Sequence, residues 1–334
     1  MKHIIFASDN NYAMPCMVAM ASLLYNTDSK DCDLHILTEG FNERNLTILN
    51  RIRERFCEAT ISLDIIDNNA LLKSAITSSR FPIANFFRLL VPQIYDFKKV
   101  LYLDCDIIVN RDISPLWNTD ITGYVCGMIM DQDCDDITLH NRIYSHNHTY
   151  YNAGVMLMNL ELWRKDNIAD KVMAFMKDFP QCCLYPDQDA INKVVGDQIL
   201  ELSCKYNVQE NWFMPKDRWK VHQNKWIKIE DALLSPVILH YTGHDKPWSK
   251  VCPHPLKSLY HEYEQFIFSN KNDAKPIFTK ATWEADSQEY LTTLESLERR
   301  KRHKHIRRAN VFIILFSLET IVILVYFFIS LILQ

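Results

Sequence analysis

The chain has 334 residues and a mass of 39.4 kDa, enough for one large domain or two ordinary ones with a core that needs no disulfide or metal for stability. Hydrophobic residues make up 48% and charged residues 23%, which excludes a disordered chain and a membrane protein with many spans. The formal net charge is −4, whereas a general nucleic-acid binder is expected to carry a basic excess. We therefore expect a folded protein without a nucleic-acid partner.

Glycine and cysteine usage further limits the classes of protein that fit the sequence. Only 6 glycines occur, and none forms the GxGxxG or GxxxxGK patterns that cradle phosphates. The 10 cysteines contain no CxxC pair, which favours buried, reduced thiols over a disulfide framework. The first residues, MKHIIFASDNN, lack the long apolar run of a signal peptide. We therefore expect the folded part to lie in a reducing cytosol.

Short apolar runs alternate with helical periodicity along most of the chain, which is typical of βαβ units with a largely parallel sheet. One clear amphipathic helix is predicted over Asn42 to Phe56, with Leu46, Leu49, Ile52 and Phe56 on one stripe. The expected fold class is therefore α/β, with a mostly parallel central sheet flanked by helices. The predicted strands are His3 to Ala7, Leu34 to Leu37, Ile61 to Ile66, Val100 to Leu103, Tyr124 to Ile129, Val155 to Asn159 and Val237 to Tyr241.

The sharpest motif is KKVLYLDCDIIVN, in which a buried strand leads into Asp104 and Asp106. Residues two apart on an extended chain face the same way, and open α/β sheets place ligands at the carboxyl ends of their strands. Two carboxylates there suit Mg²⁺ or Mn²⁺ with a diphosphate. The alternative is a solvated acidic loop.

Two further segments carry polar groups near apolar elements. In YYNAGVMLMNLELWR, Asn152 precedes a glycine that would let a ligand approach the backbone. In YPDQDAINKV, Asp187, Gln188 and Asp189 stand before a helical run, where they either cap the helix or grip sugar hydroxyls. Arg88, in NFFRLLVPQIY, is a candidate anion partner.

The segment VILHYTGHDKPW is another apolar strand, and it delivers His240 at its end. An imidazole beside two carboxylates would favour Mn²⁺ over Mg²⁺ because nitrogen is the softer ligand. Lys246 could neutralise a leaving diphosphate. A structural role for His240 is the alternative.

The C-terminal part changes character. Residues 251–298 read as a helical appendage, and residues 299–310 form a basic segment. Residues 311–334 contain the apolar run VFIILFSLETIVILVYFFISLIL, in which Glu319 is the single charge. As a helix, about 23 residues rise about 35 Å, enough to span a bilayer core of about 30 Å. We expect a membrane-anchoring tail that either spans or lies in the interface, with its basic flank on the cytoplasmic side.

Together these residues resemble a known family. FASDNNY, LYLDCDIIV, YNAGVMLMNL, PDQDAIN and HYTGHDKPW occur in the order and spacing of glycosyltransferase family 8, over roughly residues 1–250. The resemblance implies a catalytic domain of the Rossmann-like GT-A fold that transfers a hexose from a UDP-sugar with retention, using Mn²⁺ or Mg²⁺. The basic, apolar tail is similar to the membrane attachment of the lipopolysaccharide enzymes in this family.

The resemblance also implies roles for individual residues. Tyr12 would stack on uracil and Asp9 would bind the base or ribose, with Ala7 and Asn11 beside them. Asp104, Asp106 and His240 match the metal ligands, and Gly243 and Lys246 match the diphosphate contacts. The groups around the donor hexose match Arg88, Asp104, Asn152, Asp187 and Gln188. The chain departs from the family pattern in two places. The family usually has small or apolar residues where this chain has His244 and Asp245. In addition, Ser8, Asn10 and Asn11 vary the family's opening motif.

Retention needs either a carboxylate nucleophile or same-face attack in which the departing phosphate takes the acceptor's proton. Because a neutral amide is a weak nucleophile, we favour same-face substitution, with Gln188 orienting the sugar and Asp189 as the reserve nucleophile. The expected partners are a UDP-hexose (galactose or glucose) and a lipopolysaccharide core or other lipid-linked acceptor at the cytoplasmic face of the bacterial inner membrane.

Two other classes fit parts of the pattern. A haloacid-dehalogenase-like phosphatase also places DxD after an apolar strand and uses Mg²⁺, with Asp104 as nucleophile. A non-catalytic UDP-sugar-binding membrane scaffold is the second alternative. Phosphate release from simple esters would identify the former, and UDP-sugar binding without turnover the latter.

Overall fold

The computed structural model describes residues 1–67, 81–136, 138, 139, 143, 149–213, 223–252 and 254–269. The chain divides into two compact units, Met1–Lys280 and Ala281–Gln334, and every described residue lies in the first. The basic segment 299–310 and the apolar segment 311–334 fall outside the described residues, as does most of the predicted appendage, so their predicted roles stay predictions. Within the described part, no helix is both long and apolar enough to cross a membrane.

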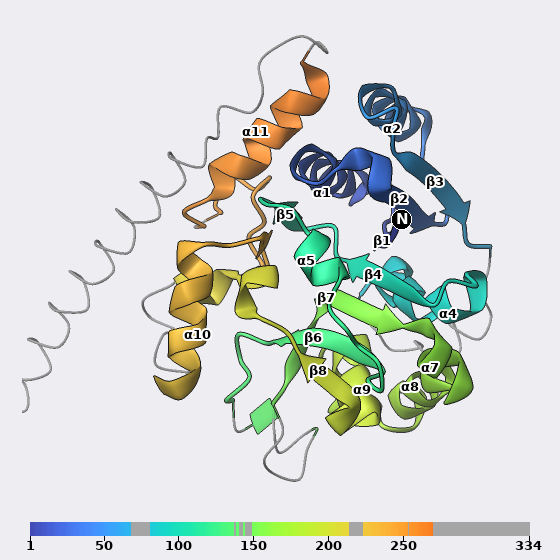
Figure 1. The fold of residues 1–334 in the computed structure, drawn as a ribbon, viewed down its shortest axis with the longest axis vertical. Coiled ribbons are helices and arrows are strands. Elements are labelled where there is room, and N and C mark those ends of the chain that lie inside the picture. Colours follow the sequence, from blue (N-terminus) through green and yellow to red (C-terminus); the bar gives the residue numbers. More distant parts are fainter. Residues whose placement is uncertain are drawn as a thin grey trace, which may run out of the picture. The chain divides into compact units, whose positions relative to one another are not determined.

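A seven-stranded sheet forms the centre of the fold, in the order β3-β2-β1-β4-β7-β6-β8 (Figure 1). Only β7 runs antiparallel to its neighbours, β4 and β6, so the expected mixed, mostly parallel sheet is confirmed. The strands are β1 (Lys2–Ala7), β2 (Cys32–Thr38), β3 (Thr60–Ile65), β4 (Lys99–Leu103), β6 (Cys126–Met130), β7 (Tyr151–Asn159) and β8 (Ile199–Glu201).

A second, three-stranded sheet lies beyond the carboxyl end of β4. Its strands are β5 (Ile107–Val109), β10 (Ile238–His240) and β9 (Val208–Gln209), with β10 in the middle. In the antiparallel β5–β10 pair, His240 lies opposite Ile107. This register brings the end of β10 beside Asp106, the residue before β5. All seven predicted strands are therefore present, six in the central sheet and one here, whereas the short strands β5, β8 and β9 were not predicted.

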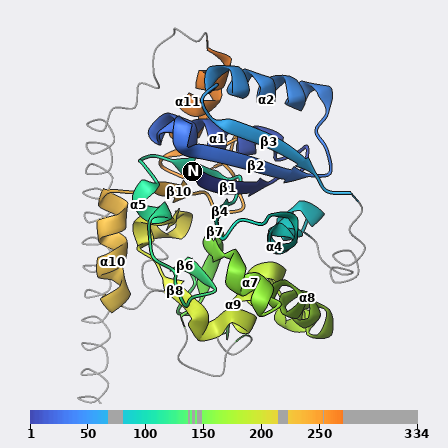
Figure 2. The same cartoon turned by 45° about the vertical axis from the view of Figure 1, so that its right-hand side comes forward.

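Helices cover both faces of the central sheet (Figures 1 and 2). Helices α1, α2 and α11 lie on one face, and α4, α7, α8 and α9 lie on the other. The second face holds a large apolar core, in which Ile5, Tyr102 and Met156 of the strands pack with Trp163 and Val172 of the helices. The helices are α1 (Ala13–Asn26), α2 (Glu43–Arg55), α4 (Val91–Ile94), α5 (Ser114–Trp117), α7 (Leu160–Lys165), α8 (Ile168–Asp178), α9 (Pro186–Val195), α10 (Gln223–Leu234) and α11 (Lys257–Phe268).

Helix α2 matches the predicted amphipathic helix closely. It spans Glu43–Arg55, and the side chain of Asn42 caps it by accepting a hydrogen bond from the backbone N–H of Asn45 at 2.9 Å. Leu49 and Ile52 are buried as predicted, and Ile48 joins them. Leu46 and Phe56 are only half buried, so the buried stripe is rotated slightly from the predicted one.

The pairing of β7 with β6 contains a large bulge. Met128 lies opposite Met156, but the next residue, Ile129, lies opposite Asn152. The three residues between Asn152 and Met156 therefore have no partner on β6. A bulge frees backbone groups from the ladder and bends the strand, and this one lies beside the carboxyl end of β4, because Leu103 pairs with Val155.

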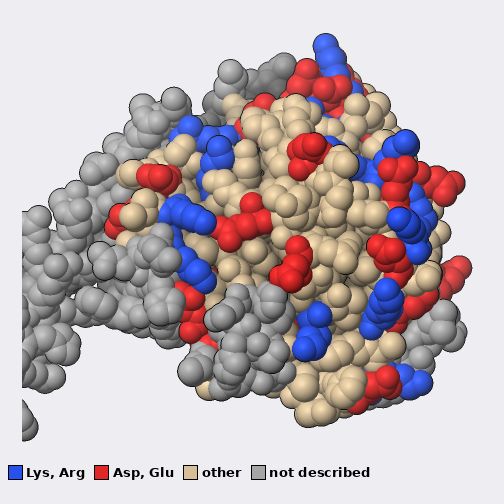
Figure 3. Space-filling view, turned by 60° about the horizontal axis from the view of Figure 1, so that its bottom comes forward, with Lys and Arg blue, Asp and Glu red and all other residues tan. Residues whose placement is uncertain are grey.

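Charged side chains of both signs are interspersed over the face drawn in Figure 3. Among the residues coloured there, Lys and Arg do not gather into a single stripe.

Candidate active site

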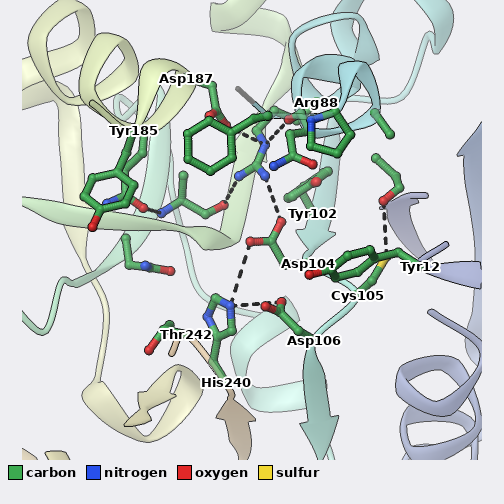
Figure 4. A pocket seen from close by; sticks show the side chains of 18 of the residues that line it. Tyr12, Arg88, Tyr102, Asp104, Cys105, Asp106, Tyr185, Asp187, His240 and Thr242 are labelled. Atoms are coloured by element: carbon green, nitrogen blue, oxygen red, sulfur yellow. Dashed lines mark hydrogen bonds and ion pairs between the residues drawn. The ribbon is translucent and has the colours of Figure 1, made fainter. Parts of the chain in front are cut away.

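A polar cavity of about 780 Å³ opens at the carboxyl ends of β1, β4 and β6. Open α/β sheets place ligands at this edge. Of the residues predicted for the site, those that line the cavity are Ala7, Asp9, Tyr12, Arg88, Asp104, Asp106, Asn152, Asp187, Gln188, His240, Gly243 and Lys246. Figure 4 shows the carboxylates of Asp104 and Asp106 turned toward His240 in its centre.

Asp104, Asp106 and His240 form a candidate metal site. One ligand atom from each lies within 4.8 Å of the others. His240 Nε2 is 3.2 Å from Asp106 Oδ1 and 3.8 Å from Asp104 Oδ2. Two carboxylate oxygens and one imidazole nitrogen are a donor set that suits Mn²⁺, so the three residues fit a divalent cation.

A chain of amides fixes the imidazole of His240. Its Nδ1 lies 2.9 Å from Asn207 Oδ1, and Asn207 Nδ2 donates to Asn152 Oδ1 at 2.9 Å. Asn152 Nδ2 in turn donates to Asp131 Oδ2 at 2.9 Å. Because Nδ1 donates to an amide oxygen, Nε2 presents its lone pair to the two aspartates, as a metal-binding histidine requires.

Lys246 lies on the other side of Asp106. Its Nζ donates to Asp106 Oδ2 and to the backbone oxygen of Tyr241, both at 2.6 Å. Burial would raise the pKa of Asp106, but the positive charge of Lys246 and its hydrogen bond outweigh burial and hold this pKa below its ordinary value. The Asp106 carboxylate is therefore ionised at neutral pH and available to a cation.

Two glycines allow close approach within the site. A Cβ on Gly154 would overlap His240 Cε1 and lie 2.6 Å from Asp104 Oδ2. A Cβ on Gly243 would overlap the carboxylate of Glu210, which accepts the Gly243 N–H at 2.9 Å. Only glycine leaves room at these positions.

Arg88, in a short 3₁₀ helix (η2, Ile83–Leu89), binds two aspartates at once. Its Nη2 is 2.8 Å from Asp104 Oδ1 and its Nε is 3.0 Å from Asp187 Oδ2. Its Nη1 donates to the backbone oxygen of Ala153 at 2.7 Å, in the β7 bulge, and its guanidinium lies over the Tyr102 ring at 4.4 Å. Burial would lower the pKa of Arg88, but the negative charge of Asp104 outweighs burial and raises it.

Gln188 is held at both ends of its amide. Its Oε1 accepts the Ala153 N–H at 3.0 Å, and its Nε2 donates to Asp131 Oδ2 at 3.2 Å and to the Tyr150 hydroxyl at 3.0 Å. Helix α9, which carries Gln188, is tied to β7 because Asn192 Oδ1 accepts the backbone N–H of Tyr151 at 2.8 Å. The amide of Gln188 therefore has a fixed orientation in the cavity.

Asp189 does not reach the cavity. It is fully buried and accepts hydrogen bonds from the Tyr150 hydroxyl and, at 2.9 Å, from the Tyr185 backbone N–H. Consecutive residues on a helix point about 100° apart, so with Gln188 facing the cavity Asp189 turns into the protein. The structure thus separates Asp189 from the residues that sequence reasoning grouped with it.

Of the residues expected to bind uridine, some line the cavity and others do not. Asp9 Oδ1 accepts the backbone N–H groups of Asn11 and Tyr12, both at 2.9 Å. Tyr12 lines the cavity and meets Trp248 edge-on, with ring centroids 5.6 Å apart. Asn11 is exposed and lies outside the cavity lining. Asn10, a departure from the family motif, instead anchors the start of α2 by accepting the Asn42 N–H at 2.8 Å.

Several residues that line the cavity or support it were not predicted from the sequence. Asp131 and Gln132 follow β6 as Asp104 follows β4, so the run GMIMDQD held a signal that the same strand-end rule could have found. Thr242 and Tyr185 also line the cavity. Asn207 carried no signal, because it precedes a strand of only two residues.

Comparisons with known proteins agree with this geometry. A model of glycosyl transferase family 8 matches residues 3–252. General stress protein A of Bacillus subtilis (strain 168) is 30% identical over 274 residues, covering 79% of this chain and 93% of that protein. Lipopolysaccharide 1,2-glucosyltransferase of Escherichia coli (strain K12) is 25% identical over 310 residues, covering 91% and 85%.

The fold is also similar to that of a solved structure. The galactosyltransferase LgtC, crystallised with donor and acceptor sugar analogues, superposes with a TM-score of 0.71 at 23% identity, covering 80% of this chain and 97% of that one. The family match gives no support to the haloacid-dehalogenase alternative. The position of Asp104 agrees, because it follows a strand in the middle of a GT-A sheet. The family model matches about three quarters of the chain, the fold is GT-A-like, and a DxD pair follows β4. The chain therefore belongs to glycosyltransferase family 8 and is an enzyme of the hexosyltransferase type.

Proposed function

We propose that this enzyme transfers a hexose, galactose or glucose, from a UDP-sugar to a lipopolysaccharide core or another glycolipid, with retention of configuration and with Mn²⁺. The observation that carries the proposal is the convergence of Asp104, Asp106 and His240 in one cavity with the Arg88–Asp187 pair and Gln188. Two similar proteins, a lipopolysaccharide glucosyltransferase and a galactosyltransferase, support the donor and acceptor classes.

The metal ligands would be Asp104, Asp106 and His240. A bound Mn²⁺ would withdraw charge from the diphosphate as it leaves. Mg²⁺ is a second candidate, and the imidazole nitrogen favours Mn²⁺. The amide chain from Asn207 to Asp131 holds the imidazole in place for this purpose.

The chain's own residues would bind the rest of the donor. Tyr12 offers a ring face to the uracil and is steadied by Trp248. Asp9 borders the same end of the cavity. Lys246 adds a positive charge beside Asp106, and Gly243 lines the same cavity.

The arrangement supports same-face substitution. The bond between the anomeric carbon and the phosphate oxygen breaks, and the acceptor hydroxyl oxygen bonds to the same face of that carbon. The acceptor's proton passes to the departing phosphate oxygen, so atoms and charge balance. Gln188, fixed by Ala153, Asp131 and Tyr150, would orient the sugar, whereas Asp189 would have to leave two hydrogen bonds to act as a nucleophile.

We also propose that the enzyme works at the cytoplasmic face of the bacterial inner membrane. The basic segment 299–310 and the apolar segment 311–334 support this location, because a surface-held enzyme meets a bilayer-embedded acceptor far more often. Deleting residues 299–334 should release the protein from membranes and leave hydrolysis of the UDP-sugar measurable. Retention on the membrane after this deletion would contradict the anchor.

The decisive test is release of UDP. The detergent-solubilised full chain is incubated with Mn²⁺ and a panel of UDP-sugars, beside a variant carrying Asp104→Asn and Asp106→Asn. Release from one donor, lost in the variant, would support the proposal and identify the sugar. Binding of UDP-sugar without release in the presence of glycolipid acceptors would favour a non-catalytic scaffold instead.

A further inference from the structure

We propose a second metal site, for Zn²⁺, built by His3, Asp33 and His35 and separate from the catalytic cavity. It lies near the start of β1 and β2, whereas the cavity lies at the end of these strands. Ala7, four residues after His3, lines the cavity, and none of the three proposed ligands does. At about 3.3 Å per residue, β1 separates the two places by about 13 Å.

The parallel register of β1 and β2 places the three side chains together. His3 lies opposite Asp33, and Ile5 lies opposite His35, so all of them point to one face of the sheet. His3 Nδ1 is 2.8 Å and His35 Nε2 is 3.2 Å from the same oxygen, Asp33 Oδ2. One ligand atom from each residue lies within 4.8 Å of the others. Ligands about 2.0–2.2 Å from a tetrahedral Zn²⁺ lie about 3.3–3.6 Å from each other. The 3.2 Å separation is close to this range, and the 2.8 Å separation would lengthen when the metal enters.

The hydrogen bonds of His35 leave one ring nitrogen available. Its Nδ1 lies 3.0 Å from Asp64 Oδ2, which also accepts a hydrogen bond from the Tyr95 hydroxyl. Since this carboxylate accepts, Nδ1 carries the proton and Nε2 presents a lone pair. That Nε2 is buried and has no hydrogen-bond partner, yet it faces Asp33 Oδ2 at 3.2 Å.

Two acceptor atoms at this distance repel each other unless a proton or a metal cation lies between them. A carboxylate that holds the far nitrogen of a ligating histidine is a regular feature of zinc sites, where it fixes the tautomer and the ring orientation. Asp64 and Tyr95 supply that support to His35. The ring of His3 is steadied in turn by stacking on Phe97, with centroids 3.7 Å apart and planes 11° apart.

The donor set and its exposure both favour zinc. Two imidazoles and one carboxylate are a softer set than the two aspartates and one histidine of the catalytic cavity, and Zn²⁺ favours imidazole ligands more than Mg²⁺ or Mn²⁺ does. The side chains of His3, Asp33 and His35 are 24%, 14% and 11% exposed. The site is thus reachable from solvent, and water can take the fourth position. Bound zinc would tie β1 to β2 and stabilise this end of the sheet.

The test uses the full chain with Asp104→Asn and Asp106→Asn, which weakens metal binding in the cavity. Chelator-treated protein is titrated with Zn²⁺ by calorimetry, and Co²⁺ serves as a spectroscopic substitute. We expect one equivalent of Zn²⁺, tetrahedral Co²⁺ absorption bands, and a Zn²⁺-dependent rise in melting temperature. Adding Asp33→Asn or His35→Gln should abolish all three signals, and Asp64→Asn should weaken binding about 10–100-fold.

The matched control is His261→Gln, which removes a histidine of α11 that pairs with Glu264 at 3.1 Å and should change none of the signals. If His35→Gln does not fold, His3→Asn replaces the most exposed of the three ligands and should also abolish binding. Failure of the parent to bind Zn²⁺, or unchanged binding in the folded Asp33 and His3 variants, would overturn the proposal.

Discussion

The Nδ1 atom of His240 lies 2.9 Å from the side-chain oxygen of Asn207, so a residue that touches neither aspartate sets which nitrogen of the histidine faces them. The amide nitrogen of Asn207 continues the chain to Asn152. The imidazole of His240 thus depends on two asparagines for its orientation.

Replacing Asn207 with alanine should therefore impair metal use. Loss of a group that orients a ligating histidine typically costs 10–100-fold in metal affinity, and we expect the Mn²⁺ concentration for half-maximal UDP release to rise by about this factor. Asn50→Ala, in an exposed position of α2, is the control. An unchanged Mn²⁺ requirement would show that Asn207 does not act through His240.

Gly154→Ala should inactivate the enzyme without unfolding it. The added methyl overlaps His240 and lies 2.6 Å from Asp104 Oδ2, and displacement of reacting groups by about 1 Å can cost about 100-fold in rate. In Gly127→Ala the atoms nearest to the new Cβ belong to the side chain of Leu202, at 3.0–3.1 Å, which can shift without moving the site, so most activity should remain. Circular dichroism would verify both folds, and equal activity of the two variants would contradict the steric argument.

Arg88→Met should reduce both stability and activity. It would leave Asp104 and Asp187 without their shared cation, and removing one partner of a buried ion pair costs about 3–5 kcal/mol. Urea denaturation measures the loss, with the exposed Arg51→Met as control. A loss of stability no larger than that of the control would mean that water solvates both carboxylates well enough to replace Arg88.

His254 should make stability fall in mild acid. Burial lowers its pKa to about 3, so below the ordinary value of about 6.5 the unfolded chain takes up a proton that the folded chain does not. The free energy of unfolding then decreases as pH falls below about 6.5, at up to about 1.4 kcal/mol per pH unit, until pH approaches 3.

Denaturation of the wild type and of His254→Asn between pH 7 and 4.5 isolates the contribution of His254 to the pH dependence of stability. The variant keeps a side-chain acceptor near the backbone N–H of Leu256, which His254 Nδ1 accepts at 3.1 Å. Its stability should depend less on pH than that of the wild type, whereas His261→Gln should leave the dependence unchanged. Parallel curves for all three proteins would show that His254 titrates normally.

The sequence predicted the strands and the residues at their ends because both follow simple periodic rules. Asp104, Asp106 and His240 each adjoin an apolar strand, and the register of β5 with β10 brings them together. Asn207 could not be predicted, since its place depends on a two-residue strand and on contacts between distant segments. Asp189 could not be separated from Gln188 by spacing, because the rotation of α9 decides which of them faces the cavity.

The bulge in β7 makes chain length as important as side-chain identity at this point of the enzyme. Ala153 meets Arg88 and Gln188 through its backbone oxygen and N–H, and the N–H of Asp104 donates to the backbone oxygen of Gly154 at 2.8 Å. Removing a single residue here would reverse the facing of the residues before it and would displace several catalytic groups together. Efforts to alter sugar preference should therefore vary the residues around the cavity while keeping every insertion and deletion out of this strand.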